Sequence, residues 1–522
     1  MSARTAAKRL PRSLASAVLK RGRDWCLRAI AGICLSAAAL DASAADDTLR
    51  IGSKRFTEAY ILAQILAQTA APHARVDVKA GLGNTAIVYE ALRSGSIDLY
   101  PEYVGTIDLE ILKNKAPSSL DAMNRQLASL GLGVAIPLGF NDGYALAMRE
   151  ADAQKLGIRT LSDLAKHREQ RLGLSNEFIG RADGWKGLAQ RYGYAHEPLG
   201  IDHGLAYDAL ANRQVDVIDI YTTDAKIEHL GLRVLADDLS YFPRYDAVVL
   251  YRLDVPSRFP QAWHALQQLA DRIDERAMIA MNARAELKGV AFDVIARDFL
   301  LGKSQASEAR RGLVGKLLGP DLGRLTLQHV LLVLVSVGVA ALIGIPVAIA
   351  VASRSAWRAG VLGATSVLQT IPSLAMLAVL ISLMGAIGTG PALVALTLYA
   401  LLPIVRNTCT GLAEVPAGLK LASLALGLQR RDQLLHIELP LAFPTIVAGV
   451  RTATVICVGT ATIAAFIGAG GYGERIVTGL ALNDSELMLA GAIPSALLAL
   501  ACEGLFEAIE ALLRRRRGVA RV

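Results

Sequence analysis

The chain has 522 residues and a formal net charge of +8, and its apolar residues are distributed unevenly along it. This length favours two or three domains rather than one. Eight basic residues lie before residue 29 and five lie after residue 513. Because the positive charge is concentrated at two ends that flank apolar segments, it is typical of membrane topology signals and argues against nucleic-acid binding.

The five cysteines lie outside the central part of the chain, since none occurs between Asp46 and Asp321. We therefore expect no disulfide there, and no metal-ligand spacing occurs in the sequence. Near the start, basic residues are followed by an apolar run at 29–40 and by Ala42-Ser43-Ala44. This order predicts that residues 1–45 are a secretory signal peptide or an uncleaved membrane anchor.

Residues 46–301 alternate short apolar strands with helical patterns. The alternation predicts an α/β domain with a largely parallel sheet. A segment of this length is generous for one such sheet, so we expect two lobes. The chain is expected to cross between them near 137–141 and to return near 241–245, which puts a ligand cleft between the lobes.

A glycine- and serine-containing stretch, residues 302–321, is the candidate linker to a strongly apolar region at 322–513. A helix needs about 20 apolar residues to cross the hydrocarbon core of a bilayer. We predict about five spans in this region. The third is short, and Pro403 is expected to kink its end. The predicted spans are 325–351, 361–384, 391–405, 446–467 and 487–513.

Basic residues follow the first, third and fifth predicted spans, as Arg354, Arg406 and the arginine run at 514–517. Positively charged loops stay in the cytoplasm, so residues 514–522 form a cytoplasmic tail. The start of the first span, and with it the soluble domain, then lies outside, in agreement with the signal segment. We therefore expect a multi-pass protein of a bacterial inner membrane whose N-terminal binding domain is in the periplasm.

A polar segment between the third and fourth spans starts with Glu414-Val415-Pro416, and its apolar residues recur at helical spacing up to Gly427. This spacing predicts a short amphipathic helix on the membrane surface that Gly427 ends. Such a helix either docks in a groove of a partner protein or is an ordinary loop helix. Alone, the segment favours neither interpretation.

The wider pattern favours docking. It comprises 437–440 (IELP), 449–451 (GVR), 467–473 (IGAGGYG) and 491–494 (GAIP). With these motifs, residues 322–513 resemble the membrane subunit of osmoprotectant ABC importers of the glycine betaine and choline type. The resemblance implies an all-α polytopic domain of the ABC type I importer permease architecture. It also implies a coupling loop, residues 414–440, that docks on an ATPase through Glu414, Ala422, Gly427, Ile437, Leu439 and Pro440.

The chain departs from the family at one point of this loop. The family motif begins Glu-Ala-Ala, whereas this chain has Leu421-Ala422-Ser423. No Gly-x-x-x-x-Gly-Lys-Ser/Thr phosphate loop occurs either. The resemblance thus implies that separate cytoplasmic ATPase subunits bind ATP and Mg²⁺, that this chain holds no cofactor, and that two copies form a homodimer through their membrane domains.

The soluble part, residues 49–300, is similar to the periplasmic binding proteins of the same importers. The resemblance implies a two-lobed α/β periplasmic binding domain, type II-like, for a small quaternary ammonium or zwitterionic ligand. Its matching segments are 52–58 (GSKRFTE), 83–85 (GNT), 97–106 (IDLYPEYVGT), 141–146 (NDGYAL), 181–184 (RADG), 221–224 (YTTD) and 242–245 (FPRY).

By this resemblance, four tyrosines form a cage for the ligand cation: Tyr103, Tyr144, Tyr221 and Tyr245. A quaternary ammonium ion donates no strong hydrogen bond, so ring faces must recognise it, each contributing about 0.5 to 2 kcal/mol depending on desolvation. The alternative is that these are four ordinary half-buried tyrosines with satisfied hydroxyl groups.

A betaine also has a carboxylate, for which Thr85, Thr106 and the backbone amides after Ser53 are candidate donors. Lys54 and Arg181 are basic candidates, although such side chains usually stay exposed. Asp142 stands where some family members have asparagine. An acidic Asp142 favours a cation and disfavours a nearby carboxylate, which makes choline or a bulkier betaine a better candidate than glycine betaine.

We therefore interpret the chain as the fused substrate-binding and permease subunit of an ATP-driven importer for quaternary ammonium or betaine-type compatible solutes. An importer of another small zwitterion, such as ergothioneine or an amino-acid derivative, and a ligand-sensing receptor that does not pump are the alternatives. We do not expect an enzyme, because no nucleophile elbow, metal cluster or pair of catalytic carboxylates stands out in the sequence.

Overall fold

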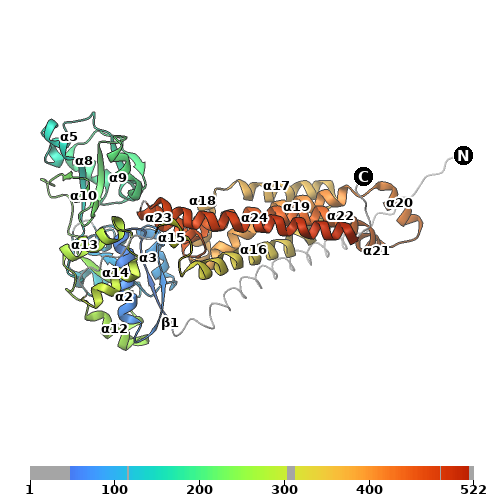
Figure 1. Ribbon diagram of the computed structural model, residues 1–522, viewed down its shortest axis with the longest axis horizontal. Coiled ribbons are helices and arrows are strands. Elements are labelled where there is room, and N and C mark those ends of the chain that lie inside the picture. Colours follow the sequence, from blue (N-terminus) through green and yellow to red (C-terminus); the bar gives the residue numbers. More distant parts are fainter. Residues whose placement is uncertain (1–47, 115–116, 303–311, 483, 517–522) are drawn as a thin grey trace. The chain divides into compact units, whose positions relative to one another are not determined.

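The computed structural model describes residues 48–114, 117–302, 312–482 and 484–516 (Figure 1). The predicted signal peptide or anchor at 1–45 lies outside these residues, as do residues 303–311 of the predicted linker and residues 517–522 of the basic tail. The described part contains a binding domain with two five-stranded sheets and a helical domain that begins at α15 (Leu313–Leu317).

The first lobe of the binding domain has a sheet of order β2-β1-β3-β10-β4. Strand β1 pairs with β3 in parallel, whereas β10 runs antiparallel to both β3 and β4. In Figure 1 this lobe combines blue elements from the start of the chain with the yellow-green helices α12 to α14. Its strands are β1 (Thr48–Gly52), β2 (Arg75–Lys79), β3 (Leu99–Tyr103), β4 (Leu132–Ala135) and β10 (Ala247–Arg252).

The second lobe has a sheet of order β7-β6-β8-β5-β9. Strand β6 is parallel to β7 and β8, and β5 is antiparallel to β8 and β9. Both sheets are therefore mixed, not largely parallel, because β5 and β10 arrive directly from the other lobe without a helical crossover that would fix their direction. The strands are β5 (Tyr144–Arg149), β6 (Leu172–Ser175), β7 (Leu199–Ile201), β8 (Val217–Tyr221) and β9 (Leu232–Val234).

Two crossovers join the lobes, residues 136–143 between β4 and β5 and residues 235–246 between β9 and β10. This confirms the predicted crossings near 137–141 and 241–245. The crossovers are bonded to each other, since the Asp142 amide donates to the Tyr245 carbonyl oxygen (3.0 Å) and the Tyr245 amide donates to Asn141 Oδ1 (2.7 Å). A hinge of two paired strands results.

Several helices begin where the lobes meet. Asn84, Ser175 and Asp202 cap α3, α7 and α9 by accepting hydrogen bonds from backbone amides of the first turn. Helix α2 has Phe56 at its N-cap and packs against α12, α13 and α14. The helices of this domain are α2 (Thr57–Ala70), α3 (Thr85–Arg93), η1 (Thr106–Ile111), α4 (Leu120–Ala128), α5 (Glu150–Leu156), α6 (Leu161–Leu164), α7 (Asn176–Gly180), α8 (Trp185–Tyr192), α9 (His203–Ala211), α10 (Lys226–His229), α11 (Val255–Arg258), α12 (Pro260–Gln267), α13 (Glu275–Glu286) and α14 (Phe292–Leu300).

In the helical domain, α19 packs against both α16 and α22, and buried small and aliphatic residues form the core between them. Figure 1 shows α16, α19, α22 and α24 lengthwise beside one another. The elements after α15 are α16 (Leu322–Val351), α17 (Ser355–Thr370), α18 (Ser373–Met384), α19 (Thr389–Ala413), α20 (Ala417–Ala425), α21 (Arg430–Gln433), η2 (Leu434–Glu438), α22 (Leu439–Thr460), η3 (Ala461–Ile467), α23 (Gly473–Leu482) and α24 (Ser485–Arg516).

Four helical segments of the described chain are long and apolar enough to cross a membrane, and a bent pair makes a fifth if it counts as one span. The four are Leu322–Val351, Thr389–Ala413, Arg430–Ile467 and Ser485–Leu512. The bent pair, α17 and α18, turns by 100° where the second span was expected to be continuous.

The bend follows from Pro372, which has no amide hydrogen and forces Ile371 into extended backbone (φ −67°, ψ 126°). The freed Ile371 carbonyl accepts a hydrogen bond from the hydroxyl of Tyr399 (2.5 Å). The third span is also longer than predicted, because α19 continues through Pro403 to Ala413. A polar side chain in the added part of α19 bonds within the helix, because the Thr408 hydroxyl donates to the Ile404 carbonyl (2.7 Å).

Candidate ligand-binding and coupling sites

Three of the four predicted cage tyrosines are brought together by the hinge and its neighbouring strands. Tyr144 begins β5 directly after the first crossover and pairs in register with Tyr221 at the end of β8. Tyr245 belongs to the second crossover. The ring centroid of Tyr144 lies 5.1 Å from that of Tyr221 and 5.7 Å from that of Tyr245. These rings form the centre of an aromatic cluster.

Tyr103, the fourth predicted residue, joins this cluster through Phe56. The Phe56 centroid is 6.2 Å from Tyr103 and 5.0 Å from Tyr221, so a ring of the first lobe links the two groups. Phe178 stacks on Tyr144 at 5.1 Å and Phe242 lies 6.5 Å from it. The sequence argument named none of these phenylalanines as site residues, although Phe56 and Phe242 lie inside its motif segments.

The tyrosines can form a cage for a cation and still have satisfied hydroxyl groups. The Tyr103 hydroxyl donates to Glu58 Oε1 (2.5 Å) and the Tyr245 hydroxyl to Asp183 Oδ2 (2.8 Å). All four tyrosines are buried, with at most 9% exposure at Tyr221. Ring faces can therefore serve recognition while the hydroxyls of Tyr103 and Tyr245 are satisfied inside the protein.

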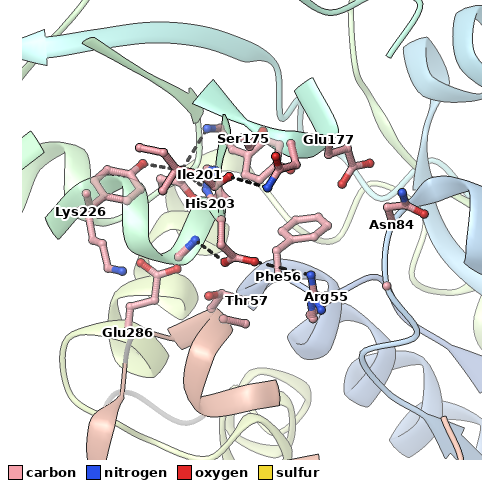
Figure 2. A pocket seen from close by; sticks show the side chains of 18 residues that line it. Arg55, Phe56, Thr57, Asn84, Ser175, Glu177, Ile201, His203, Lys226 and Glu286 are labelled. Carbon is pink, nitrogen blue, oxygen red and sulfur yellow. Dashed lines mark hydrogen bonds and ion pairs between the residues drawn. The ribbon is translucent and has the colours of Figure 1, made fainter. Parts of the chain in front are cut away.

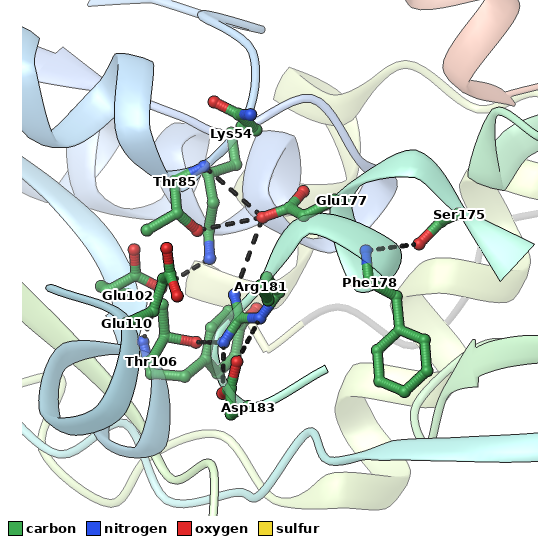
Figure 3. A network of polar contacts seen from close by, with 12 residues as sticks. Lys54, Thr85, Glu102, Thr106, Glu110, Ser175, Glu177, Phe178, Arg181 and Asp183 are labelled. Carbon is green, nitrogen blue, oxygen red and sulfur yellow. Dashed lines mark hydrogen bonds and ion pairs between the residues drawn. The ribbon is translucent and has the colours of Figure 1, made fainter. Parts of the chain in front are cut away.

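The two basic candidates are buried, unlike most side chains of their kind. The guanidinium group of Arg181 lies 5.1 Å from the Tyr144 ring centroid, donates to Thr106 Oγ1 (3.1 Å) and pairs with Asp183 (2.6 Å). Figure 3 shows this guanidinium between Thr106 of the first lobe and Asp183 of the second. Lys54 Nζ lies 2.5 Å from Glu102 Oε1.

Thr85, a candidate donor for a ligand carboxylate, is bonded to a carboxylate of the protein. Its hydroxyl donates to Glu177 Oε1 of the second lobe (3.0 Å), which is also 3.7 Å from Arg181 Nη1 (Figure 3). The contacts of Thr85 with Glu177 and of Thr106 with Arg181 thus join the lobes. Opening the cleft must break both of them.

A second interlobe contact is a network of acids, which we call the acid network: Glu58, Thr223, Asp142 and Asn282. The Thr223 hydroxyl lies 2.6 Å from Glu58 Oε2 and 2.9 Å from Asp142 Oδ1, and Asn282 Nδ2 donates to the same Glu58 oxygen (3.3 Å). A hydroxyl has one hydrogen to donate. The hydroxyl can therefore donate fully to only one of the two carboxyl groups at a time.

The pKa values of both carboxyl groups in the acid network are raised. Burial raises the pKa of Glu58 to about 7. Burial, with the nearby charge of Glu58, raises the pKa of Asp142 well above its ordinary value. A raised pKa reduces the negative charge of Asp142 and so weakens the argument from its acidity against glycine betaine, which stays a prediction.

A cavity of about 190 Å³ lies beside the aromatic cluster, and we call it the side cavity. Phe56 and Tyr221 line it, but Tyr103, Tyr144 and Tyr245 do not. Figure 2 shows residues of both lobes around it, with Asn84 and Phe56 from the first and Ser175 and His203 from the second. Among the described residues, no group of three or more His, Cys, Asp or Glu side chains could hold a metal ion.

His203 is one of the basic residues that line this cavity, next to Tyr221. Its ring centroid is 4.5 Å from that of Tyr221, and its Nε2 is 3.2 Å from Asp224 Oδ2. Burial alone would lower the pKa of His203, but the charge and hydrogen bond of Asp224 raise it to about 9. His203 is therefore protonated at neutral pH.

The predicted coupling segment, residues 414–440, contains the expected short helix. Helix α20 ends at Ala425, and the amides of Gly427 and Leu428 donate to the carbonyls of Leu424 and Ser423 (3.0 and 3.1 Å). This is a Schellman motif, with Gly427 in the left-handed conformation (φ +77°). The prediction that Gly427 ends the helix is confirmed.

The outer face of this helix is apolar and open. Leu421 and Leu424 are 66% and 58% exposed, and the predicted residues Glu414, Ala422 and Pro440 are exposed as well. Ile437 and Leu439 are half-buried. Glu438 differs from its neighbours, since it is buried and paired with Arg430 (2.6 Å).

Both halves of the chain match known protein families. Residues 47–301 match the substrate-binding domain of the ABC-type glycine betaine transport system. Residues 340–515 match the inner membrane component of binding-protein-dependent transport systems.

Each of the following relatives matches about half of this chain or less. A glycine-betaine-binding protein of Pseudomonas aeruginosa is 38% identical over 52% of this chain and 94% of its own length. The osmoprotectant import permease protein OsmW of Salmonella typhimurium is 40% identical over 37% of this chain and 91% of its own length. The ergothioneine transport permease and binding protein EgtU of Helicobacter pylori is 33% identical over 48% of this chain, and the match spans about half, 47%, of that protein.

A substrate-binding fold and a membrane permease fold are thus encoded together. The chain belongs to the glycine betaine and choline family of ABC importer components, as a substrate-binding domain fused to a permease domain.

Proposed function

We propose that this protein captures quaternary ammonium or betaine-type solutes and conducts them through the membrane as one subunit of an ATP-driven importer. The observation that carries the proposal is the aromatic cluster. It combines Phe56 and Tyr103 of the first lobe with Tyr144, Tyr221 and Tyr245 around the hinge, next to the buried cation Arg181. Ring faces near a fixed cation suit a solute with a trimethylammonium group at one end and a carboxylate at the other.

In this proposal the solute replaces contacts that the protein now makes with itself. The solute cation lies against the rings of the cluster. Its carboxylate accepts hydrogen bonds from Arg181 and Thr106, which now bond to each other, with Lys54 close by at 4.9 Å from the Tyr103 centroid. Because the donors come from both lobes, the solute stabilises the closed cleft by a population shift.

The relatives support this solute class in their shared chemistry. Their names refer to glycine betaine, ergothioneine and osmoprotectants, and glycine betaine and ergothioneine both carry a trimethylammonium group beside a carboxylate. Further relatives are named for choline and carnitine, which carry the same cation. The solutes in these names thus share the trimethylammonium cation and differ in the rest of the molecule.

Transport also needs an energy source and a second half of the permease. We propose that separate cytoplasmic ATPases, which bind ATP and Mg²⁺, dock on the exposed leucines of α20, and that two copies of this chain form a homodimer through their membrane domains. The binding domain then faces the periplasm and delivers solute from there. The apolar exposed face of α20 supports this part, because such faces commonly mark protein interfaces.

The test is binding of solutes to the purified full-length chain in detergent, measured by calorimetry. We expect choline, glycine betaine, carnitine or ergothioneine to bind in the micromolar range or tighter. Glycine and histidine, which lack the quaternary cation, should bind at least about a hundredfold more weakly, since loss of cation–ring contacts costs up to about 2 kcal/mol for each ring. Equal binding of the methylated and unmethylated compounds contradicts the proposal.

A receptor that does not pump is separated from an importer by a second measurement. Radiolabelled solute uptake into proteoliposomes should require both ATP inside the vesicle and a co-expressed ATPase. Solute binding without any ATP-dependent uptake, in the presence of an ATPase that co-purifies with the chain, argues for sensing alone.

A further inference from the structure

The membrane domain has charged side chains inside two of its spans. Arg451 lies about 18 Å along α22 from its first residue, Leu439. Glu503 lies about 14 Å along α24 from Leu512, the last residue of the fifth span. That span of 28 residues is about 42 Å long, whereas the hydrocarbon core of a bilayer is about 30 Å thick. When the span is centred in the bilayer, Glu503 is therefore inside the core.

These two charges form an ion pair between the spans, which we call the span pair. Helix α22 packs against α24, and Arg451 Nη2 lies 2.6 Å from Glu503 Oε1. Because a charge in hydrocarbon is costly, ionisable groups inside spans face other protein groups or a water-filled cavity, and they commonly mark the path of an ion or solute. A purely structural role explains the span pair less well, since apolar side chains of similar volume often hold two elements together as firmly as a buried ion pair.

The span pair is open on one side and has a third member. The side chains of Arg451 and Glu503 are 29% and 36% exposed within the single chain, so a molecule beside α22 has access to both charges. Arg451 Nη1 also lies 3.7 Å from Oε1 of Glu510, about two turns further along α24. When a solute takes the place of Glu503, the guanidinium of Arg451 therefore still has an acidic neighbour. This arrangement allows the partners of Arg451 to exchange.

The surface of α22 around Arg451 differs from a helix surface that contacts lipid. Between residues 445 and 467, all of which the structure describes, no large apolar side chain is exposed, and the exposed residues are Thr452 and Gly459. Helix α16, by contrast, exposes leucines such as Leu334 (61%) and Leu342 (70%). A surface of small and polar residues beside an ion pair suits water and a polar solute better than lipid tails.

We propose that the span pair is a second solute site, inside the membrane domain, through which zwitterionic solutes pass after they leave the binding domain. The solute carboxylate takes the place of Glu503 on the guanidinium of Arg451, and the solute cation lies against the carboxylate of Glu503. Each charge then keeps a neighbour of opposite sign, which matters most where the dielectric constant is low. This inference rests on the proposed function, because it assumes that the chain conducts such solutes.

A zwitterion and a simple cation should depend on the span pair differently, since choline has no carboxylate for Arg451. The test is uptake of radiolabelled glycine betaine and choline into proteoliposomes that contain the full-length chain with its co-purified ATPase. Arg451→Gln should lower the maximal rate for glycine betaine by about tenfold or more and that for choline by less than about threefold. Glu503→Gln should lower both rates by about tenfold. The half-saturation concentrations, which reflect capture by the binding domain, should change by less than about twofold.

Three further variants separate recognition of the solute from packing of the helices. Arg451→Lys keeps the charge and should retain glycine betaine uptake within about threefold of the wild-type rate. The double variant Arg451→Leu/Glu503→Leu replaces the ion pair by an apolar one, and its glycine betaine uptake should stay at least about tenfold reduced. Arg324→Gln is the matched control, because Arg324 also pairs with a glutamate of the membrane domain, Glu474 (2.7 Å), but its side chain is 52% exposed. It should leave the uptake of both solutes unchanged.

The outcomes separate this inference from the function on which it rests. If Arg451→Gln reduces the uptake of both solutes equally, or if the double leucine variant regains glycine betaine uptake, the span pair only holds two helices together and the inference is wrong. It is also wrong if light scattering shows that Arg451→Gln dissociates a dimer, since the pair then contacts a second copy, or if no variant changes uptake. In all these cases the proposed function stands. If the wild-type complex takes up neither solute, the proposed function itself fails.

Discussion

The proposed ligand site and the coupling segment differ in the exposure of the side chains that are expected to contact a partner molecule. In the ligand site, charged groups such as Lys54 and Arg181 are buried, and each has a partner within the chain. In the coupling segment, Leu421 and Leu424 are largely exposed to solvent. In the proposed function, the buried charges exchange these internal partners for groups of the solute, and the exposed leucines form the docking surface for an ATPase.

The largest expected effect comes from removing the charge of Arg181. Arg181→Leu takes away the guanidinium that contacts Thr106 and the Tyr144 ring. We expect about a hundredfold weaker binding of betaines, since charge-assisted hydrogen bonds contribute about 1.5 to 3 kcal/mol each. Choline has no carboxylate and should lose less than about tenfold. Calorimetric titration of the full-length chain measures both.

Arg244→Ala is the matched control for this change, because Arg244 also pairs with an aspartate but its side chain is 79% exposed. It should leave both affinities unchanged. Equal losses for choline and betaines in Arg181→Leu would contradict the assignment of Arg181 to the carboxylate.

A second prediction concerns pH and the buried carboxyl group of Glu58, which belongs to the acid network between the lobes. Glu58 has a pKa of about 7 in the closed cleft against an ordinary value of 4.5. We expect opening of the cleft to expose Glu58 to water and return its pKa toward the ordinary value, so that the protonated form favours closure. This contribution is complete below about pH 4.5 and is lost as the pH rises through 7. Solute affinity should therefore fall with rising pH, by up to about tenfold for each unit within this window.

The measurement is the dissociation constant between pH 4.5 and 8, with proton uptake read from binding enthalpies in two buffers. Glu58→Gln, whose amide stays uncharged, should flatten the profile. Glu90→Gln changes a carboxylate at the exposed end of α3 and should keep the wild-type slope. A wild-type profile without slope would show that the acid network takes up no proton on closure.

A third prediction separates ring faces from hydroxyl groups. Tyr144 lies at the centre of the cluster, with four aromatic neighbours within 6.5 Å. Tyr144→Ala should weaken binding of quaternary ammonium solutes by about tenfold or more, whereas Tyr144→Phe, which retains the ring, should stay within about threefold. Equal losses in the two variants would mean that the hydroxyl and not the ring face recognises the solute.

The smallest expected effect concerns the coupling segment. Leu424→Asp places a charge on the exposed face of α20, which should reduce ATP-dependent uptake by about fivefold to tenfold, as loss of one good interface contact does. Solute binding should not change, because the ligand site is untouched. Leu199→Asp on an exposed position of the binding domain serves as the control. Unchanged uptake in Leu424→Asp would remove α20 from the docking surface.

The sequence predicts those features that a local pattern encodes. Gly427 ends α20 because its position after an amphipathic run needs the left-handed conformation. The two crossovers were predicted because the α/β segment is too long for one sheet, and the motif tyrosines Tyr144 and Tyr221 proved to be register partners. Each of these follows from residues close together in the chain or from a family motif.

Features that depend on distant pairings could not be predicted. Nothing near Glu58 in the sequence indicates that Thr223 places it close to Asp142, so the acid network was not foreseen. The burial of Arg181 depends on Thr106 and Asp183, and Phe178 has no motif around it. The 100° bend at Pro372 needs the Tyr399 hydroxyl to satisfy a freed carbonyl, which only the packing of α19 supplies.

The paired crossovers give the ligand site a mechanical property. Asp142 and Tyr245 lie on the two crossovers, which are bonded to each other, so a solute that contacts them as proposed is held near the hinge, where a rotation of the lobes would displace atoms least. Groups far from the axis, such as Thr85 and Glu177, travel furthest for the same angle. A small solute bound near the hinge can therefore control a large displacement of the lobe edges. Another protein that contacts those edges can detect the closed form.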